Sequence, residues 1–327
     1  MSRAKWSVQR VALTAVAVLA TFGIGVFAGR EIFRAPARPQ DQAWSYDLDQ
    51  FSRVPSDLER YRLELRIPVD LAEPRGLASQ PDGTVLVCGD RVLLAVDRRG
   101  AVLARYPLES APTCVSVGGD GRVYIGLGDH VEVIDPAPGG TARPRGAPRA
   151  WSDLGPQAIV TSIAASGANV FVADAGNRAV LRFDTGGKLL GRIEGDWVVP
   201  SPYFDLAAQP DGTVWVANPG RHLLLHFTPE GRLLGSWGRE SAAPEGFLGC
   251  CNPVHIALLP CGSLVTSEKG ILRVKVFEPE GRLTGVAALP ADFPATEKAV
   301  DLATRKANGG EILVLVPGER AVRVYCK

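Results

Sequence analysis

From about Tyr61 onward, hydrophobic and polar residues alternate in short runs that are separated by tight-turn dipeptides. Stretches such as "GTVLVCG" and "GTVWVAN" have the period of two that is typical of half-buried β-strands. Asp-Gly, Glu-Gly and Gly-Gly pairs between the runs are residues that favour tight turns. No sustained helical period occurs in this region, so the pattern predicts an all-β fold over residues 61–327.

The runs recur six times in the order strand, turn, strand, loop, strand, glycine turn and strand. The copies are Gly76–Tyr106, Cys114–Gly140, Ser162–Ile193, Asp205–Trp237, His255–Val286 and Asp301–Cys326. Repeats of about 40–50 residues with four strands each are typical of propeller blades. The last copy has only three strands, and "YRLELRIP" (Tyr61–Pro68) offers a fourth with matching alternation. We therefore expect a six-bladed β-propeller in which this N-terminal strand closes the last blade.

The repeat also resembles a known family. The pattern is clearest in "VFVADAGNRAVLRFDTGGKLLGRI" (Val170–Ile193), and the likeness extends from about Arg75 to Cys326. It is similar to the NHL-repeat family of six-bladed β-propellers, here in a bacterial, membrane-anchored or exported form. The resemblance implies the propeller fold, but the family includes scaffolds, ligand-binding domains and a few enzymes, so it does not select one function.

The N-terminal region predicts that the protein is anchored in a membrane or exported. A basic segment (1–10) precedes the uninterrupted apolar run Val11–Gly29, and a Pro-containing linker (30–60) leads to the propeller. The run is long enough to span a bilayer as a single-pass anchor. A cleaved signal peptide is the alternative, with Val26-Phe27-Ala28 as the cleavage site. We expect an anchor in a bacterial inner membrane with the propeller on the periplasmic side, or an exported protein if the segment is cleaved.

The composition and the absence of common motifs limit the kinds of partner and activity that we expect. The net charge is +1, and no Lys/Arg cluster with interleaved aromatic residues occurs, so no nucleic-acid partner is expected. The motifs G-x-S-x-G, H-E-x-x-H and C-x-x-C are absent, which leaves no recognisable hydrolase, zinc-protease or structural-zinc signature. A protein or small-molecule ligand is therefore the expected partner.

The first strand of each propeller blade lines the central channel, and every second residue faces it. Aligning the copies gives one channel position per blade. These positions are Gly76, Cys114, Ser162, Asp205, His255 and Asp301. Two carboxylates and an imidazole on three adjacent blades predict either a divalent-metal site, for Zn or Ca, or a general acid–base site. The alternative is a channel lined with polar groups that bind water. The family resemblance extends to peptide-amidating lyases, which use histidines near such positions as zinc ligands, but only one of the three residues here is a histidine.

Three of the six cysteines lie in "EGFLGCCNPVHIALLPCGSLVTSEKG" (residues 245–270). Cys250 and Cys251 directly precede the first strand of the fifth blade, at the channel mouth, where Cys250, Cys251, Asn252 and His255 form the predicted ligand-binding set. A local structural role, a disulfide, and a redox or ligand contact all remain open for the pair, since the sequence does not give connectivity. Cys261 lies about 20 Å farther along the strand, too far to share a metal with His255.

The remaining cysteines and the loop after the second strand of the fifth blade are expected to have structural roles. Cys88 and Cys326 are expected to be packed thiols, and Glu268-Lys269 to form a solvated loop. The leading functional hypothesis is a membrane-tethered, extracytoplasmic propeller that serves as a binding or scaffold module and is not an enzyme. One alternative is a metal-dependent lyase or hydrolase that uses His255, Asp205 and Asp301. A weaker alternative is a redox-responsive protein that uses Cys250 and Cys251.

Overall fold

The computed structural model describes residues 54, 58, 61–135, 149–151, 154–307 and 309–327, with the backbone alone at 149 and 150. The expected basic N-terminus (1–10) and anchor or signal segment (11–29), and nearly all of the linker (30–60), lie outside the described residues. Within the described ranges, no helix combines the length and apolar character needed to cross a bilayer.

The described residues form 24 strands in six antiparallel four-stranded sheets, which are the blades of a propeller. Blade 1 contains β2 (Pro74–Ser79), β3 (Val85–Gly89), β4 (Val92–Val96) and β5 (Val102–Pro107). Blade 2 contains β6 (Cys114–Val117), β7 (Val123–Gly126), β8 (Val131–Ile134) and β9 (Arg149–Trp151). Blade 3 contains β10 (Val160–Ser166), β11 (Asn169–Asp174), β12 (Ala179–Asp184) and β13 (Leu189–Ile193).

The second half of the ring repeats this order. Blade 4 contains β14 (Leu206–Ala208), β15 (Val214–Asn218), β16 (Leu223–Phe227) and β17 (Leu233–Trp237). Blade 5 contains β18 (His255–Leu258), β19 (Leu264–Ser267), β20 (Val274–Phe277) and β21 (Leu283–Ala288). Blade 6 contains β22 (Asp301–Arg305), β23 (Glu311–Val316), β24 (Ala321–Cys326) and β1 (Arg62–Pro68). The expected six-bladed all-β architecture is confirmed.

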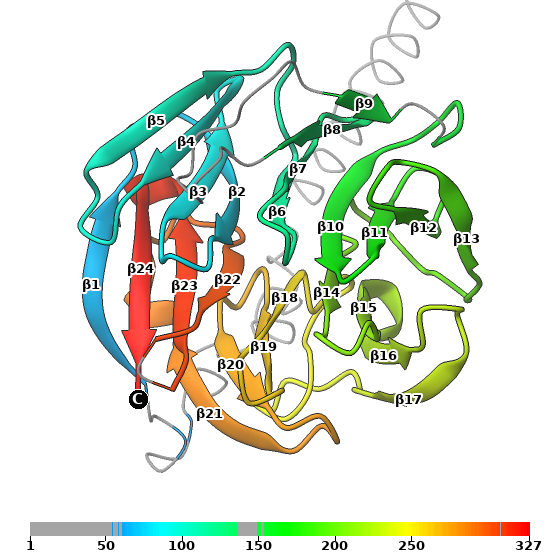
Figure 1. Cartoon of the computed structure of the whole chain (residues 1–327). Helices are drawn as coiled ribbons and strands as arrows, with labels where there is room; N and C mark the ends of the chain where they lie inside the picture. Colours follow the sequence, from blue (N-terminus) through cyan, green and yellow to red (C-terminus); the bar gives the residue numbers. More distant parts are fainter. Residues whose placement is uncertain (1–53, 55–57, 59–60, 136–148, 152–153, 308) are drawn as a thin grey trace, which may run out of the picture. The chain divides into compact units, whose positions relative to one another are not determined.

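The ring closes through strands from opposite ends of the propeller. Strand β1 pairs antiparallel with β24, from Arg62 opposite Cys326 to Pro68 opposite Ala321. The first strand therefore becomes the outer strand of the last blade, as the sequence predicts. In Figure 1, β1 lies beside β24, and β2, β6, β10, β14, β18 and β22 are the innermost strands of their sheets. Each inner strand contacts the inner strands of both neighbouring blades.

Burial follows the position of a strand in its blade. The middle strands are almost wholly buried, because they have sheet neighbours on both sides and other blades on both faces; β3 and β15 have every residue buried. The outer strands β5, β13 and β17 lie at the rim and are mostly exposed. Leu189 and Leu233 accordingly remain about half exposed, at 46% and 51%.

In blades 1, 2 and 4 the tight turn after the inner strand contains an aspartate followed by a glycine: Asp82-Gly83, Asp120-Gly121 and Asp211-Gly212. At Asp211-Gly212, Gly212 has a φ of +88°, a left-handed conformation that favours glycine. The Asp211 carboxylate accepts hydrogen bonds from both the amide and the hydroxyl of Thr213. In blade 5, Cys261 occupies the aspartate position and its Sγ lies 3.3 Å from Ser263 Oγ. Cys261 is therefore a turn residue, which agrees with the repeat alignment.

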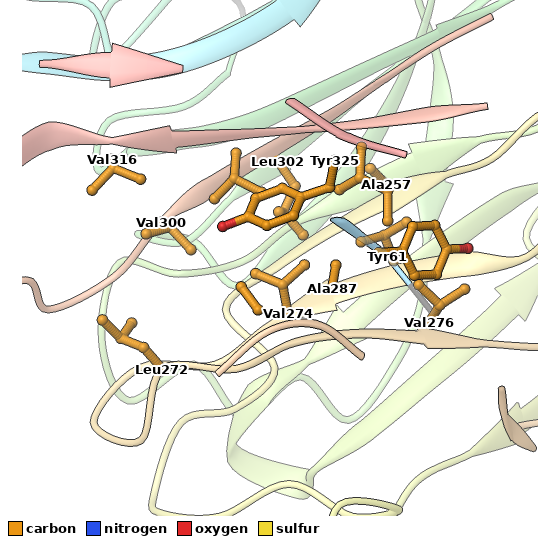
Figure 2. Packing of buried hydrophobic residues seen from close by; sticks show 14 of the residues in the cluster. Tyr61, Ala257, Leu272, Val274, Val276, Ala287, Val300, Leu302, Val316 and Tyr325 are labelled. Carbon is orange, nitrogen blue, oxygen red and sulfur yellow. The ribbon is translucent and has the colours of Figure 1, made fainter. Parts of the chain in front are cut away.

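The hydrophobic core lies between adjacent blades. Figure 2 shows one such cluster, in which Tyr61, Val274, Leu302 and Tyr325 bring together side chains of blades 5 and 6. Val274 is fully buried and Tyr325 is 3% exposed. Full burial of an aliphatic side chain contributes about 1.5–3 kcal/mol, so repeated inter-blade packing of this kind stabilises the ring.

Glu268, in the loop after β19, is buried, which corrects the expectation that this residue is solvated; Lys269 is partly buried and Gly270 is exposed. Glu268 is 1% exposed, and Arg273 and Lys275 are both fully buried. Arg273 Nε and Nη2 donate to the two Glu268 carboxylate oxygens at 2.6 and 3.0 Å, and Lys275 Nζ lies 3.2 Å from Glu268 Oε2. We call these three residues the Glu268 cluster.

The Glu268 cluster fixes the segment that leads to the cysteine pair. Arg273 donates to the carbonyl of Ala242, and Lys275 donates to the carbonyls of Pro244 and Gly246. The Glu268 carboxylate also accepts the amide of Leu248. The sequence interpretation failed here because residues 242–248 have no counterpart in the other repeats, so nothing in the alignment showed what would cover Glu268.

Candidate ligand site at one mouth of the channel

The inner strands enclose a cavity of about 240 Å³ along the propeller axis. Of the six aligned channel positions, five line this cavity: Cys114, Ser162, Asp205, His255 and Asp301. The sixth, Gly76, lies where β2 approaches β6 closely, and a Cβ there would come within 2.7 Å of Cys88 Sγ and 3.0 Å of the Cys114 Cα. The repeat alignment therefore identified the channel wall, and glycine is needed at one point of it.

Asp205, His255 and Asp301 meet in the channel as the alignment predicts, and we call them the channel triad. His255 Nδ1 lies 3.2 Å from Asp301 Oδ1 and 3.5 Å from Asp205 Oδ2. Their side chains are 12–19% exposed. A single imidazole nitrogen thus faces two carboxylates in a mostly buried setting, where an Nδ1–H group can donate to either one.

The carboxylates of the triad also join neighbouring blades. Asp205 Oδ2 accepts the amide of Ile256 in blade 5 at 2.6 Å, and Asp301 Oδ2 accepts the amide of Leu77 in blade 1 at 2.7 Å. Ser162 Oγ accepts the amide of Leu206 in the same manner, from blade 3 to blade 4. These polar positions therefore link the inner strands around the axis, in addition to any chemistry at the channel.

Burial and charge both shift the pKa values in the triad. Burial raises the pKa of Asp301 to about 6; the His255 charge opposes this shift and the Asp205 charge adds to it. For His255, burial alone would lower the pKa, but the attraction of Asp301 and the hydrogen bond to Asp205 outweigh it and raise the pKa. Both groups therefore bind protons more tightly in the folded protein than in a free chain.

The triad does not fit a three-ligand metal centre. Because Nδ1 of His255 faces two carboxylates, it carries the proton and leaves only Nε2 for a metal. Each carboxylate oxygen already accepts at least one backbone amide or the imidazole. In the described part of the chain, no group of three or more His, Cys, Asp or Glu side chains has a metal-binding arrangement. The expected Zn or Ca site at Asp205, His255 and Asp301 remains a prediction from the sequence.

The two ends of the channel differ. A cavity of about 680 Å³ opens between the turns that follow the inner strands, and Pro81, Pro210, Pro260, Cys261 and Lys306 contribute to it. We call this end the turn mouth. Cys261 lies here, at the opposite end of β18 from His255, so it belongs to a different site from Cys250 and Cys251.

The opposite end, where the chain enters the inner strands, carries the cysteine pair. All six cysteines lie in the described residues and all are free thiols. Cys250 is exposed and Cys251 is only 3% exposed, and their sulfur atoms lie 3.0 Å apart. The structure thus presents a close pair of thiols, one open to solvent and one covered. Cys88 is fully buried and Cys326 is partly buried.

Ser201 and Lys269 lie beside the covered thiol, and Tyr203 contacts Lys269. We call these three residues together with Cys250 and Cys251 the cysteine mouth. Lys269 Nζ donates to Ser201 Oγ at 3.0 Å and lies 4.8 Å from the centre of the Tyr203 ring. Burial would raise the pKa of Cys251, but hydrogen bonds from Cys250, Ser201 and Lys269 and the Lys269 charge outweigh it, and the pKa is lowered. The Cys250 pKa is raised, mainly by its hydrogen bond to Cys251 and the charge there.

Asn252 holds Lys269 in place beside the thiols. Its side-chain Oδ1 accepts the Lys269 amide at 2.8 Å, and its Nδ2 donates to the Lys269 carbonyl at 3.0 Å and to the Leu248 carbonyl. Asn252 is 1% exposed, so this double pairing is fully covered. On the other side of the loop, His222 Nε2 bonds the Gly249 carbonyl. Asn252 is therefore a positioning residue and has little surface for a ligand.

Of the residues predicted for the channel mouth, the structure brings Cys250, Cys251 and Asn252 together, whereas His255 belongs to the channel triad. Tyr203 connects the two groups, because its ring stands edge-on to the His255 ring at 5.7 Å between centres. The sequence analysis missed Ser201, Tyr203 and Lys269 as site residues. Ser201 lies four residues before Asp205, as Cys251 lies four before His255, so the repeat register alone could have indicated that they are neighbours.

Comparisons with known proteins support the fold. No model of a known protein family matches the sequence, and no curated protein matches it either. Virginiamycin B lyase from Staphylococcus aureus superposes with a TM-score of 0.55 at 14% identity, over 78% of this chain and 82% of that chain. A catalytically inactive form of that lyase, solved with quinupristin, gives 0.58 at 12% identity, over 82% and 100%.

The WD40 β-propeller domain of Doa1 gives a TM-score of 0.58 at 14% identity, over 82% of this chain and 97% of that domain. At such identities the likeness shows the fold alone, a six-bladed propeller. Membership of the NHL-repeat family, which the repeat pattern suggests, is not confirmed by these comparisons.

Proposed function

We propose that this propeller is a binding module that takes an anionic group of a small molecule or peptide at the cysteine mouth. The observation that carries the proposal is the Lys269 ammonium group. It is partly buried, it is fixed through Asn252, and it donates to a neutral hydroxyl beside an aromatic ring. No carboxylate in the described residues pairs with it, so a carboxylate or phosphate of a ligand would form a charge-assisted hydrogen bond with this group.

The binding role agrees with the kind of fold. Propellers commonly present a ligand site at one end of the channel, and one of the similar structures was solved with quinupristin. The propeller would act outside the cytoplasm of a bacterium, tethered to the inner membrane by Val11–Gly29 or exported after cleavage of that segment. A protein partner bearing an acidic segment would use the same site.

Thermal unfolding of the full chain tests the proposal with inorganic phosphate and citrate as probes, at constant ionic strength kept with chloride. We expect both anions to raise the melting temperature in a saturable way, because a ligand that binds only the folded state stabilises it by mass action. The substitution Lys269→Met should abolish the saturable shift. Lys306→Met at the turn mouth is the matched control, since Lys306 is also exposed at an end of the channel but far from Cys251.

Equal anion shifts in the Lys269→Met and wild-type proteins would overturn the proposal. Loss of the shift in both lysine variants would also overturn it, because it would mean general electrostatic screening rather than a site. We expect the saturable rise in melting temperature to be retained in Lys306→Met and lost in Lys269→Met.

The alternative drawn from the sequence is a metal-dependent lyase or hydrolase in the channel. The raised pKa values of His255 and Asp301 beside a cavity of about 240 Å³ favour proton transfer there over metal binding. Elemental mass spectrometry of chain purified without chelators or a metal-binding tag tests the metal form of this alternative. One equivalent of Zn or Ca that is lost in His255→Ala would support it, and metal-free folded protein would exclude it.

A further inference from the structure

We propose that Cys250 and Cys251 are a dithiol–disulfide couple that exchanges with low-molecular-mass disulfides, with Lys269 and Ser201 stabilising the Cys251 thiolate. The inference shares Lys269 with the proposed anion site, but it concerns the chemistry of the thiols themselves and has its own readout. It depends on three observations: the separation of the two sulfur atoms, their unequal exposure, and the fixed ammonium group beside the covered one.

The separation brings the sulfurs close enough to react with each other. The Sγ atoms lie 3.0 Å apart, within hydrogen-bond distance, so a bond requires an approach of about 1 Å to reach the usual S–S length of about 2.05 Å. The short distance also allows one thiol to donate its proton to the other. When the pair loses one proton, the remaining proton is therefore held between the two sulfurs, and the negative charge is on Cys251.

The surroundings favour that charge distribution. Lys269 Nζ and the Ser201 hydroxyl are positioned at Cys251, and the Asn252 side chain holds both the amide and the carbonyl of Lys269. Thiolates are stabilised by nearby ammonium groups, and the thiolate is the reactive form of cysteine. Because these donors come from the loops before β14 and after β19, the folded propeller, rather than the local sequence, creates the site.

Unequal exposure assigns the two sulfurs different roles. Cys250 is exposed and meets an incoming disulfide RSSR, while Cys251 is covered and acts as its base. Cys250 Sγ attacks one sulfur of RSSR as its proton passes to the Cys251 thiolate. The S–S bond of RSSR breaks, RS⁻ leaves, and the mixed disulfide Cys250–S–S–R remains beside the Cys251 thiol.

The second step completes the exchange. Cys251 loses its proton as its sulfur attacks Cys250 Sγ, and the proton goes to the departing sulfur to give RSH. The two thiols have then lost two electrons and become a disulfide, and RSSR has gained two electrons to give RS⁻ and RSH. A disulfide between adjacent residues closes a small, strained ring and is easily reduced, so the couple is reversible under mild conditions.

Oxidation would also change the charge at the mouth. The Lys269 ammonium lies beside a thiol that can ionise in the reduced form and beside a disulfide that cannot in the oxidised form. When Cys251 is ionised, oxidation makes the local charge more positive by one unit, next to the Tyr203 ring that contacts His255.

Redox titration of the full chain with reduced and oxidised glutathione as the probe tests the couple. After acid quenching and alkylation of the remaining thiols, mass spectrometry of the peptide that contains residues 250 and 251 reports their state. We expect a reversible, intrapeptide disulfide at these residues, while Cys88 and Cys114 stay alkylatable after unfolding. Cys261→Ser, which removes the exposed thiol of the turn mouth, is the matched control and should leave the titration unchanged.

A second measurement tests the role of Lys269. The pH at which the Cys251 thiolate forms, followed by ultraviolet absorbance in Cys250→Ser, should rise when Lys269→Gln is added and return toward the original value in Lys269→Arg. Exchange with oxidised glutathione at neutral pH should slow by about tenfold or more in Lys269→Gln with both cysteines present. A purely structural lysine would not move the pH profile.

Three results would overturn the inference: two alkylated thiols at every glutathione ratio, glutathione bound at Cys250 with no intrapeptide disulfide, or an unchanged pH profile in Lys269→Gln. Failure of the anion experiment would leave the redox titration unaffected, because the titration measures the oxidation state of Cys250 and Cys251 and not the occupancy of an anion site. The two proposals are therefore tested separately.

Discussion

Blade 5 contributes to two buried ionic groups, the Glu268 cluster and the channel triad, which compensate buried charge in different ways. In the Glu268 cluster, one carboxylate pairs with two cations, and the cations donate further hydrogen bonds to the carbonyls of Ala242, Pro244 and Gly246. In the channel triad, one imidazole faces two carboxylates, and the remaining partners are backbone amides. The first group has an excess of positive charge and the second an excess of negative charge.

The difference lies in what happens to protons. The Glu268 cluster is covered on all sides and its excess charge is distributed over backbone carbonyls and the rings of Phe247 and Phe277. The channel triad lines a cavity and relieves its excess by binding protons, as the raised pKa values of His255 and Asp301 indicate. Buried charge with complete partners is therefore structural here, whereas buried charge beside a cavity retains the capacity for chemistry.

The largest expected effect is that of breaking the Glu268 cluster. Glu268→Gln removes the carboxylate with which Arg273 and Lys275 both pair in the interior, which should cost about 3–5 kcal/mol of unfolding free energy. Glu278→Gln is the matched control, because Glu278 pairs with Arg282 on the surface and its loss should cost less than about 1 kcal/mol. Urea denaturation measures both. Equal costs in the two variants would mean that the buried cluster is no more than a surface pair.

The next largest effect is the pH dependence of stability that the channel triad causes. The folded pKa of Asp301 is raised to about 6, so its contribution to stability is full below the unfolded pKa and is lost as pH rises through about 6. His255, also raised, loses its contribution at higher pH still. Relative to Asp301→Asn, the wild type should lose about 1–3 kcal/mol of unfolding free energy as the pH rises from about 4 to about 7. A parallel pH dependence in the two proteins would contradict a proton-binding triad.

The smallest effect has the opposite sign and concerns Lys275. Burial lowers the pKa of Lys275 to about 8; the Glu268 charge opposes this shift and the Arg273 charge adds to it. A lowered folded pKa gives stability that is present above the unfolded pKa and lost as pH falls through about 8. Relative to Lys275→Met, the wild type should gain about 2 kcal/mol of unfolding free energy between about pH 8 and about pH 10. Denaturation curves that shift together would show that Lys275 keeps an ordinary pKa.

The sequence predicted the fold because each blade repeats the same local rules. The alternation, the turn at Asp211-Gly212 and the spare strand Tyr61–Pro68 together determine six blades and their closure. The same register placed Asp205, His255 and Asp301 in one channel, because equivalent positions of inner strands meet at the axis.

The parts that could not be predicted depend on loops that the repeats do not share. Glu268 has the composition of a surface loop, and only the packing of residues 242–248 buries it. Lys269, after β19 of blade 5, donates to Ser201, before β14 of the neighbouring blade 4. These residues are 68 positions apart, so no local pattern encodes their contact. The unequal exposure of Cys250 and Cys251 likewise depends on this neighbouring loop and not on their adjacency in sequence.

The pairing of β1 with β24 also has a consequence for biosynthesis. Strand β1 is translated before all other strands of the propeller, yet among the described strands it pairs with β24 alone, which is translated after all of them. During translation β1 therefore has an unpaired edge, which can pair with other chains. The ring cannot close until both strands are available, so closure is a late, long-range step that should be slow relative to the folding of a single blade. Such a protein should depend on holding chaperones while it is being made.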